Sequence, residues 1–132
     1  MSLRYTLERL YHTRICGATV VITGASSGIG AAIAHTFAAV GACVVLAARS
    51  TAALEHLAAL LPGRPLVIPT DVSQPDQAQH LIARTLETYG HIDILINNAG
   101  IGLAAPVARI DPADLTAVLA VNLLGVLYTT QA

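Results

Sequence analysis

The alternation of short apolar runs with longer helical stretches is the feature that most constrains the fold of this chain. Runs rich in β-branched residues predict strands over residues 17–23, 42–48, 65–69 and 92–97. Helical periodicity follows these runs over residues 28–40, between Ser50 and Pro62, over residues 74–89 and from residue 112 onwards. Strands that are apolar throughout are typical of a parallel sheet with helices on both faces. The sequence therefore predicts an α/β fold with a doubly wound parallel sheet.

Capping signals predict where three of the helices begin. Ser50 is expected to cap the second helix, and Ser73 followed by Asp76 resembles a capping arrangement for the third. Asp111 and Pro112 suit the N-cap and the first position of the last helix. Each capping side chain would satisfy backbone N–H groups that have no partner within their helix.

Apolar positions predict which side of each helix faces the sheet. In the first helix four apolar residues share one side: Ile29, Ile33, Phe37 and Val40. In the second and third helices the corresponding residues are Leu54, Leu57 and Leu61, and Ala78, Leu81, Ile82, Leu86 and Tyr89. We expect these side chains to be buried against the sheet.

Charge and composition exclude several classes of function. The net charge is −1 and the 132 residues include no lysine, so the chain has no basic patch for nucleic acid or an anionic membrane. It has no unbroken apolar run of about 18 residues and no signal-peptide core, which predicts no membrane partner and a cytoplasmic location. The two cysteines and five histidines show no metal-ligand spacing, which predicts no metal site.

A glycine-rich turn between the first strand and the first helix is the main candidate binding site. Gly24 would allow the sharp exit from the strand, Gly28 the close approach of a diphosphate, and Gly30 the close packing of helix on strand. The free N–H groups of the helix start would then face the anion. The candidate cofactor-binding residues of this turn are Gly24, Ala25, Ser26, Ser27, Gly28, Ile29 and Gly30. An ordinary tight turn between strand and helix is the alternative.

The spacing of this turn, together with three later motifs, resembles one enzyme family. TGASSGIG, with glycines in the pattern G-x-x-x-G-x-G, resembles the cofactor signature of short-chain dehydrogenases/reductases. Asp71-Val72 follows the third strand, where this family contacts adenine. Residues 97–100 match the family's NNAG signature, and Asn122 matches the asparagine of its catalytic tetrad. The resemblance implies a Rossmann-type fold and a nicotinamide dinucleotide cofactor.

The residues after the second strand favour NADP(H) over NAD(H). An acidic residue that binds the ribose 2′-hydroxyl usually lies about 20 positions beyond the glycine turn. Arg49, followed by Ser50, occupies that place here. A guanidinium group can pair with a 2′-phosphate, which a carboxylate would repel. Many NADP-preferring relatives also carry a basic residue where this chain has Ser27, and a solvated surface arginine is the alternative reading of Arg49.

The resemblance also implies a role for each matching polar residue. Asp71 would accept a hydrogen bond from the adenine amino group, and Val72 would contact the ring. Three residues would line the cofactor near its ribose and nicotinamide: Asn98, Ala99 and Gly100. Asn97 would tie strands together, and Asn122 would hold a water molecule in a proton relay. Without the resemblance, Asp71 is a helix cap and Asn122 a satisfied buried amide or a kink.

The catalytic part of the family pattern is absent from this sequence. Members transfer a hydride between the nicotinamide and a carbonyl or alcohol substrate, with a Ser and a Tyr-x-x-x-Lys pair as the acid/base machinery. Four positions after the tyrosines stand Arg9, Ile15, Asp93 and Ala132. Two hypotheses follow: part of an NADP(H)-dependent oxidoreductase, or a non-catalytic dinucleotide-binding module that acts alone or with a partner chain.

The chain is predicted to divide into a short extension and one domain. Residues 1–15, with Leu3, Leu7, Leu10 and Tyr11 at helical spacing, form the extension. Residues 16–132 form an NAD(P)-binding Rossmann domain that is incomplete, because the sheet stops after the fourth strand and the helix that follows. The last helix is expected to expose apolar residues, and we expect self-association or a homo-oligomer through residues 111–132.

Overall fold

Four parallel strands form the centre of the structure, a computed structural model that describes residues 15–132. They are β1 (Thr19–Thr23), β2 (Cys43–Ala48), β3 (Leu66–Pro69) and β4 (Ile94–Ile96), in the order β3-β2-β1-β4. All neighbouring strands run parallel. The predicted α/β fold of the doubly wound, Rossmann type is confirmed. The predicted helical spacing within residues 1–14 lies outside the described residues.

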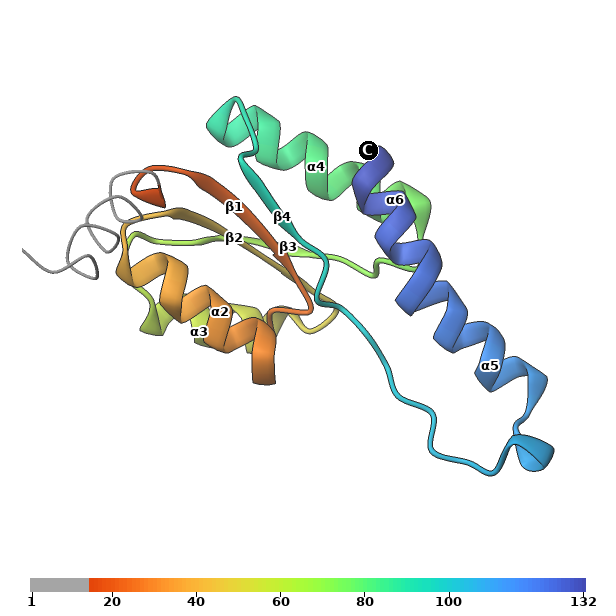
Figure 1. Cartoon of the computed structure of the whole chain (residues 1–132). Coiled ribbons are helices and arrows are strands. Elements are labelled where there is room, and N and C mark those ends of the chain that lie inside the picture. The colour runs from red at the N-terminus through yellow and green to blue at the C-terminus, as the bar shows by residue number, and fades with distance from the viewer. Residues whose placement is uncertain (1–14) are drawn as a thin grey trace, which may run out of the picture.

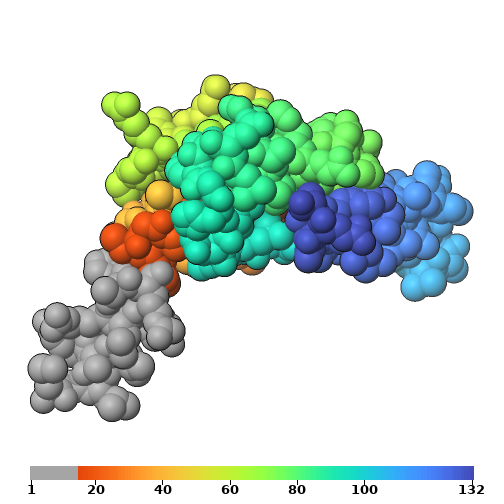
Figure 2. All heavy atoms as spheres, turned by 90° about the horizontal axis from the view of Figure 1, so that it is seen from above, coloured from red at the N-terminus to blue at the C-terminus, as the bar shows by residue number. Residues whose placement is uncertain are grey.

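Helices cover both faces of the sheet (Figure 1). On one face lie α2 (Gly28–Ala39) and α3 (Thr51–Leu60), and on the other lies α4 (Pro75–Tyr89). After the short 3-10 helix η1 (Val107–Arg109), the last helical stretch runs through α5 (Pro112–Leu119), the π-helical turn η2 (Ala120–Leu124) and α6 (Gly125–Gln131). α6 lies beside α4, whereas α5 extends beyond the sheet and forms a projection in the space-filling view (Figures 1 and 2).

The central strand β1 is buried on both faces. Val20 and Ile22 belong to the core shared with Leu54 of α3, and Val21 belongs to the core shared with Leu81 of α4. The exposed fraction of all five side chains is 0%. Burial of a side chain of this size contributes about 1.5–3 kcal/mol. The glycine-rich turn therefore leaves from a strand that is held firmly from both sides.

The predicted inner face of α2 is confirmed in part, since Ile33 and Phe37 pack against the core, but it is wrong for Ile29 and misses the residues at its centre. Its buried residues are Gly30, Ala34 and Ala38, which follow one another at intervals of one helical turn, whereas Ile29 is 74% exposed. This stripe of small residues lets the helix approach the sheet more closely than large side chains would permit. The larger residues of the predicted set flank the stripe and are half-buried: Ile33, Phe37 and Val40.

The predicted inner faces of α3 and α4 are largely confirmed. The buried residues are Leu54, Leu57 and Leu61, and Ala78, Leu81 and Ile82. Two positions of α4 differ, because Leu86 is 43% exposed and Thr85 is buried in its place. The Thr85 hydroxyl donates to the Leu81 carbonyl, 2.8 Å away, so this buried polar group is satisfied.

Two of the three predicted helix caps are confirmed. The side chains of Ser50 and Asp111 accept backbone N–H groups in the first turns of α3 and α5. The prediction for Ser73 is wrong, because Gln74 is the N-cap of α4 and makes no side-chain capping bond. The Ser73 hydroxyl donates instead to Asp71 Oδ1, 2.7 Å away. This serine therefore belongs to the loop that precedes the helix.

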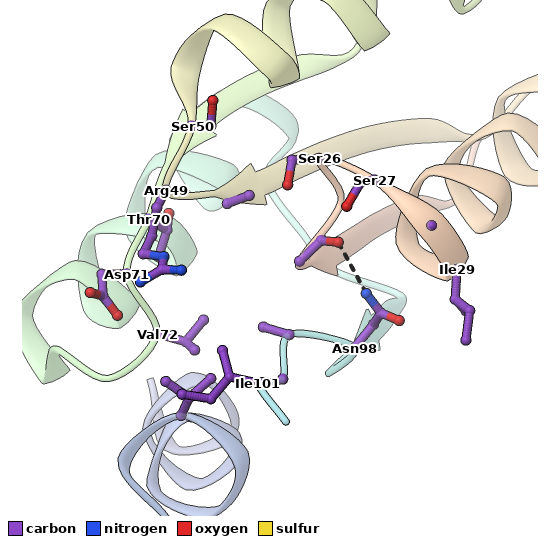
Figure 3. Close-up of a pocket in the computed structure, with 16 residues that line it drawn as sticks. Ser26, Ser27, Ile29, Arg49, Ser50, Thr70, Asp71, Val72, Asn98 and Ile101 are labelled. Carbon is purple, nitrogen blue, oxygen red and sulfur yellow. Dashed lines mark hydrogen bonds between the residues drawn. The ribbon is translucent and has the colours of Figure 1, made fainter. Parts of the chain in front are cut away.

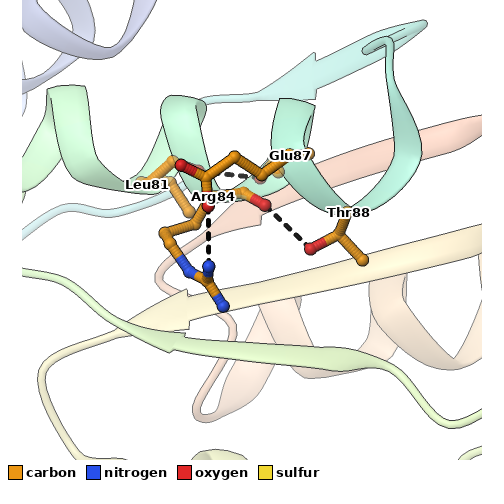
Figure 4. A network of polar contacts seen from close by, with 5 residues as sticks. Leu81, Arg84, Glu87 and Thr88 are labelled. Carbon is orange, nitrogen blue, oxygen red and sulfur yellow. Dashed lines mark hydrogen bonds and ion pairs between the residues drawn. The ribbon is translucent and has the colours of Figure 1, made fainter.

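The exposed side of α4 carries only weak polar contacts (Figure 4). Arg84 and Glu87 form an ion pair at 2.7 Å, with both side chains at least half exposed. Such surface pairs contribute about 0–1 kcal/mol. The Thr88 hydroxyl donates to the Arg84 carbonyl one turn earlier. These residues have no part in the sheet or in its carboxyl edge.

One side of the last helical stretch is left uncovered. Its exposed leucines are Leu115, Leu119, Leu123, Leu124 and Leu127. The buried residues of the stretch are Gly125 and Thr129. Gly125 ties α6 to the domain, because a Cβ added there would lie 2.8 Å from Val72 Cγ2.

The same stretch has the length and composition of a membrane-crossing helix. Pro112–Gln131 has 20 residues, and an 18-residue window within it has a mean hydropathy of 1.5; it is the single such helix within residues 15–132. The window is 11% buried, whereas a core helix of a soluble protein that passes the same test is mostly buried. The contact of Gly125 with Val72 would be broken if the helix left the domain for a bilayer.

The close packing around Gly30 predicts that a side chain at this position destabilises the fold. A Cβ at Gly30 would lie 2.3 Å from the Gly24 carbonyl oxygen, which is backbone and shifts only with the whole turn. Gly30→Ala is expected to lower the free energy of unfolding by about 1–3 kcal/mol, measured by urea denaturation. Gly102→Ala is the matched control, because nothing lies within 4 Å of a Cβ at Gly102. Equal stability of the two variants would contradict the close packing at Gly30.

Candidate functional site

A cavity lies at the carboxyl edge of the sheet, where the strand order reverses. β2 and β3 lie on one side of β1, and β4 pairs with its other side. Ligands of doubly wound sheets bind in the crevice at this point. The cavity has a volume of about 530 Å³, within the range of small-molecule sites. Its walls come from the ends of all four strands and from η2.

The structure brings most of the predicted site residues together around this cavity (Figure 3). The lining residues among them are Gly24, Ser26, Ser27, Gly28, Ile29, Arg49, Ser50, Asp71, Val72, Asn98, Ala99 and Gly100. Three predicted residues do not line it. Ala25 and Gly30 are buried behind the glycine-rich turn, and Asn122 faces the loop after β4.

The backbone of the glycine-rich turn requires glycine for two different reasons. Gly24 has φ +64° and is so close to the loop after β4 that a Cβ would lie 2.7 Å from Ala99 Cα. Gly28 has φ +55°, and nothing lies within 4 Å of a Cβ placed there. Gly24 therefore packs against the backbone of Ala99, whereas Gly28 borders open space on the cavity side.

The start of α2 leaves room and donors for an anion. Ser27 is the N-cap, with extended backbone and no side-chain capping bond. Ser26 and Ser27 both line the cavity. The first N–H groups of a helix have no partner within it, and its dipole favours negative charge there. The open backbone at Gly28 and these donors fit the diphosphate of a dinucleotide.

The far wall of the cavity combines one cation, one anion and apolar side chains. Arg49 and Asp71 lie near each other in Figure 3, yet the structure records no ion pair between them. Val72 is 7% exposed, and with Ile101 it forms an apolar surface next to the last helical stretch. A flat ring bound against this wall would make apolar contacts with its face and would have a positive and a negative side chain near its edge.

Asn98 joins the loop after β4 to the glycine-rich turn. Its Nδ2 donates to the Thr23 and Gly24 carbonyls at 3.0 and 3.1 Å. Its backbone N–H and that of Ala99 both donate to the Thr23 hydroxyl, each at 3.1 Å. The side-chain amide is therefore used to hold the two loops together.

Asn97 contacts a helix rather than another strand. Its Oδ1 accepts from the Thr129 hydroxyl at 2.6 Å, and its Nδ2 donates to the Thr130 hydroxyl at 3.2 Å. The prediction that Asn97 ties strands together is wrong, because the strand end points its amide at α6. The amide that serves β1 and β4 is that of Asn98.

Asn122 holds the loop beyond the NNAG segment. Its Oδ1 accepts from the Ile101 N–H and its Nδ2 donates to the Ile101 carbonyl, both at 2.9 Å. It lies in the π-helical turn Ala120–Leu124, a distortion that is frequent at functional sites. Both polar ends of the amide are thus occupied by one backbone residue.

Sequence reasoning missed four residues that line the cavity: Ala48, Thr70, Ile101 and Val121. Thr70 directly precedes Asp71 and is 3% exposed, and its place at the end of β3 is a signal that could have found it. Ile101 and Val121 gave no signal, because their proximity depends on the path of the loop between β4 and α5.

Within residues 15–132, no three His, Cys, Asp or Glu side chains gather in a way that could hold a metal ion.

Tyr89, whose side-chain pKa is shifted, lies outside the cavity. Burial, and second the nearby Cys43 thiol, raises the pKa of Tyr89 above its usual 10.0. Tyr89 ends α4 just before β4, at the amino ends of the strands, so it takes no part in the cavity.

Comparison with known proteins matches this geometry to enzymes of larger size. The chain is 37% identical over 135 residues to 11-beta-hydroxysteroid dehydrogenase 1A of Arabidopsis thaliana, covering 98% of this chain and 39% of that protein. It is 41% identical over 118 residues to tropinone reductase-like 2 of Erythroxylum coca, covering 86% of this chain and 43% of that protein. The chain thus spans less than half the length of these two relatives.

Solved structures and a family model lead to the same group. A 3-ketoacyl-(acyl-carrier-protein) reductase from Brucella melitensis complexed with NADH has a TM-score of 0.86 at 33% identity, covering 89% of this chain and 48% of that one. A short chain dehydrogenase/reductase from Burkholderia phymatum in complex with NAD has the same TM-score at 34% identity, covering 89% and 43%. The model for short chain dehydrogenase matches residues 18–132. The chain therefore belongs to the short-chain dehydrogenase/reductase family.

Proposed function

We propose that the chain supplies the NADP(H)-binding part of an oxidoreductase that transfers a hydride between the nicotinamide and a carbonyl or alcohol of a small molecule. The observation that carries this proposal is the cavity at the strand-order reversal, bordered by the open backbone at Gly28. The family's use of nicotinamide dinucleotides supports it, as do the NADH and NAD in the two structures named above.

The cofactor would follow the cavity from the end of β2 to the loop after β4. Arg49 and Ser50 would hold the 2′-phosphate end, and Asp71 with Val72 the adenine. The turn from Gly24 to Gly30 would hold the diphosphate, with residues 98–100 near the nicotinamide. The bound group would supply the hydride, and the chain's own residues would orient it and exclude water.

The cofactors in the two structures named above are NADH and NAD, which lack the 2′-phosphate, so they give no support to NADP(H). The proposed preference for NADP(H) therefore depends on Arg49 alone. Arg49 is exposed and lines the cavity with no ion-pair partner among the described residues. A guanidinium group there would bind a phosphate dianion through two parallel hydrogen bonds.

Arg49→Asp should reverse this preference. Loss of a charge-assisted bond of about 1.5–3 kcal/mol predicts that the Kd for NADPH rises about 10- to 100-fold, while the Kd for NADH stays equal or falls. Both are measured by cofactor fluorescence. Arg64→Asp, a charge change on an exposed arginine outside the cavity, is the control. An unchanged ratio of the two Kd values in Arg49→Asp would refute the assignment.

We propose that Asn122 corresponds to the asparagine of the family's catalytic tetrad. Its amide is occupied by the Ile101 backbone. Each end of the amide makes one bond to Ile101 and keeps the capacity for a second, so a relay water would share the amide with the Ile101 backbone. We therefore propose that it acts first by fixing Ile101 on the cavity wall.

Binding without chemistry is the second candidate function, favoured by the lack of lysine in the sequence. The chain alone is expected to bind NADPH and to oxidise none of it with a panel of ketones and aldehydes, measured at 340 nm. A fusion of residues 1–132 to the remaining half of the Brucella melitensis reductase is expected to oxidise NADPH. A fusion that binds the cofactor but never turns it over would favour the binding module, and turnover by the chain alone would contradict the proposed division.

We also propose that the uncovered side of α5 and α6 makes the chain self-associate. Leu115, Leu119 and Leu123 follow one another at intervals of one turn and are 45–54% exposed. Burial of such a side chain contributes about 1.5–3 kcal/mol relative to exposure.

Replacement of these leucines should weaken the association. The double variant Leu119→Gln and Leu123→Gln is expected to raise the dimer Kd by at least about 100-fold, measured by sedimentation velocity over a concentration series. Leu60→Gln is the control, since Leu60 is 61% exposed on α3, away from this helix. A monomer at all concentrations before any substitution would exclude self-association.

A further inference from the structure

The carboxylate of Asp71 is held by its neighbours in a way that treats its two oxygens differently. Oδ1 accepts both the backbone N–H of Ser73 at 3.0 Å and its hydroxyl at 2.7 Å. No donor among residues 15–132 is recorded for Oδ2. A carboxylate with one oxygen bonded twice cannot rotate without losing both bonds.

The backbone of Asp71 is fixed from the same side. Its N–H donates to Gln77 Oε1 at 2.7 Å, and Gln77 lies in the first turns of α4. Gln74 adds a further bond, from its Nε2 to the Ser73 hydroxyl at 3.2 Å. The start of α4 therefore holds both the main chain and the side chain of Asp71. Helix capping does not account for the Ser73 hydroxyl, since Gln74 is the N-cap.

The carboxylate with this free oxygen belongs to a residue of the cavity wall beside an apolar surface. Asp71 lines the cavity, and next to it Val72 and Ile101 offer contact to a flat ring (Figure 3). An ionised carboxylate only accepts hydrogen bonds. A ring that presents an amino group at this edge gains a bond, and a ring that presents a carbonyl oxygen meets repulsion.

We infer that Ser73 is a positioning residue that locks Asp71 Oδ1 and leaves Oδ2 as the sole acceptor at the base subsite, so that the site selects a 6-aminopurine over a 6-oxopurine dinucleotide. This inference rests on the proposed function, because it assumes that the cavity binds a dinucleotide. It goes beyond the role of Asp71 itself, since it assigns base selectivity to a residue that need not touch the base.

The decisive experiment exchanges the free oxygen for a donor. In Asp71→Asn, the Ser73 donors hold the amide oxygen in the place of Oδ1, so Nδ2 takes the place of Oδ2. The probes are NADPH and its hypoxanthine analogue, titrated by fluorescence with the whole chain. The unaltered chain is expected to bind NADPH about tenfold more tightly. Asp71→Asn is expected to reverse this preference, because the analogue carries an acceptor.

The lock itself is tested by removal of the Ser73 hydroxyl. In Ser73→Ala with Asp71→Asn the amide is free to flip, so the reversed preference is expected to vanish. Ser73→Ala alone should reduce the preference for NADPH severalfold, and Ser73→Thr, which keeps a hydroxyl, should restore it. Thr88→Val removes a hydroxyl from α4 that bonds within the helix, outside the cavity (Figure 4), and should leave the ratio unchanged.

The outcomes separate this inference from the proposed function. If the unaltered chain binds neither dinucleotide, both are overturned. Binding of NADPH with no preference between the bases overturns the inference alone. So does a Ser73→Ala variant that lowers the melting temperature but keeps the ratio, because that result makes Ser73 merely structural. A reversal in Asp71→Asn that persists without the Ser73 hydroxyl likewise refutes the lock.

Discussion

The close approach of three backbone segments at Gly24, Gly30 and Asn98 is the constraint on which the rest of the site depends. A Cβ at residue 30 would lie 2.3 Å from the Gly24 carbonyl oxygen and 2.6 Å from Asn98 Nδ2. The Asn98 amide closes this contact with bonds to two carbonyls of the turn. Since β1 is buried on both faces, the turn has no freedom to move away. The open backbone at Gly28 is therefore held in one position before any ligand arrives, which reduces the ordering cost of binding.

The two sides of the cavity are built differently. On the side of β1, β2 and β3, the buried strands β1 and β2 and the half-buried β3 hold the wall and the helix starts. On the other side, single polar groups tie the backbone: Thr23 accepts two N–H groups of the loop after β4, and Asn122 binds Ile101 twice. Beyond Ile101 the helix that follows leaves its leucines uncovered. The cavity is thus rigid at the end formed by β1, β2 and β3, and its far end depends on a few side-chain hydrogen bonds.

Sequence reasoning predicted the fold because strand burial and glycine spacing are local signals. The runs at residues 17–23 and 42–48 are almost continuously apolar, which is typical of a sheet covered on both faces. It missed the centre of the inner face of α2 because a search for large apolar residues does not detect the stripe of Gly30, Ala34 and Ala38. Packing distance, and not hydrophobicity, decides which side of that helix faces the sheet.

The site was predictable where residues follow directly on strands and unpredictable where partners come from distant loops. Arg49 directly follows β2 and Asp71 lies two residues after β3, so their place at the carboxyl edge follows from the parallel sheet. The partner of Asn97 on α6 is more than 30 positions away, and no pattern in the sequence announces it. A serine just before a helix can cap the helix or bond within the preceding turn, and the sequence looks the same in both cases. Only the structure shows that the Ser73 hydroxyl bonds to Asp71.

The distribution of charge within the cavity separates recognition from chemistry. The titratable residues that line it are Arg49, which directly follows β2, and Asp71, which lies two residues after β3. At the other end, the lining residues of the loop after β4 are Asn98, Ala99, Gly100 and Ile101, none of which exchanges a proton near neutral pH. Hydride transfer to a carbonyl requires a proton donor beside the nicotinamide. In the proposed binding mode this donor must come from outside the residues that line the cavity, so the described residues bind and orient the dinucleotide while other groups provide the acid and base.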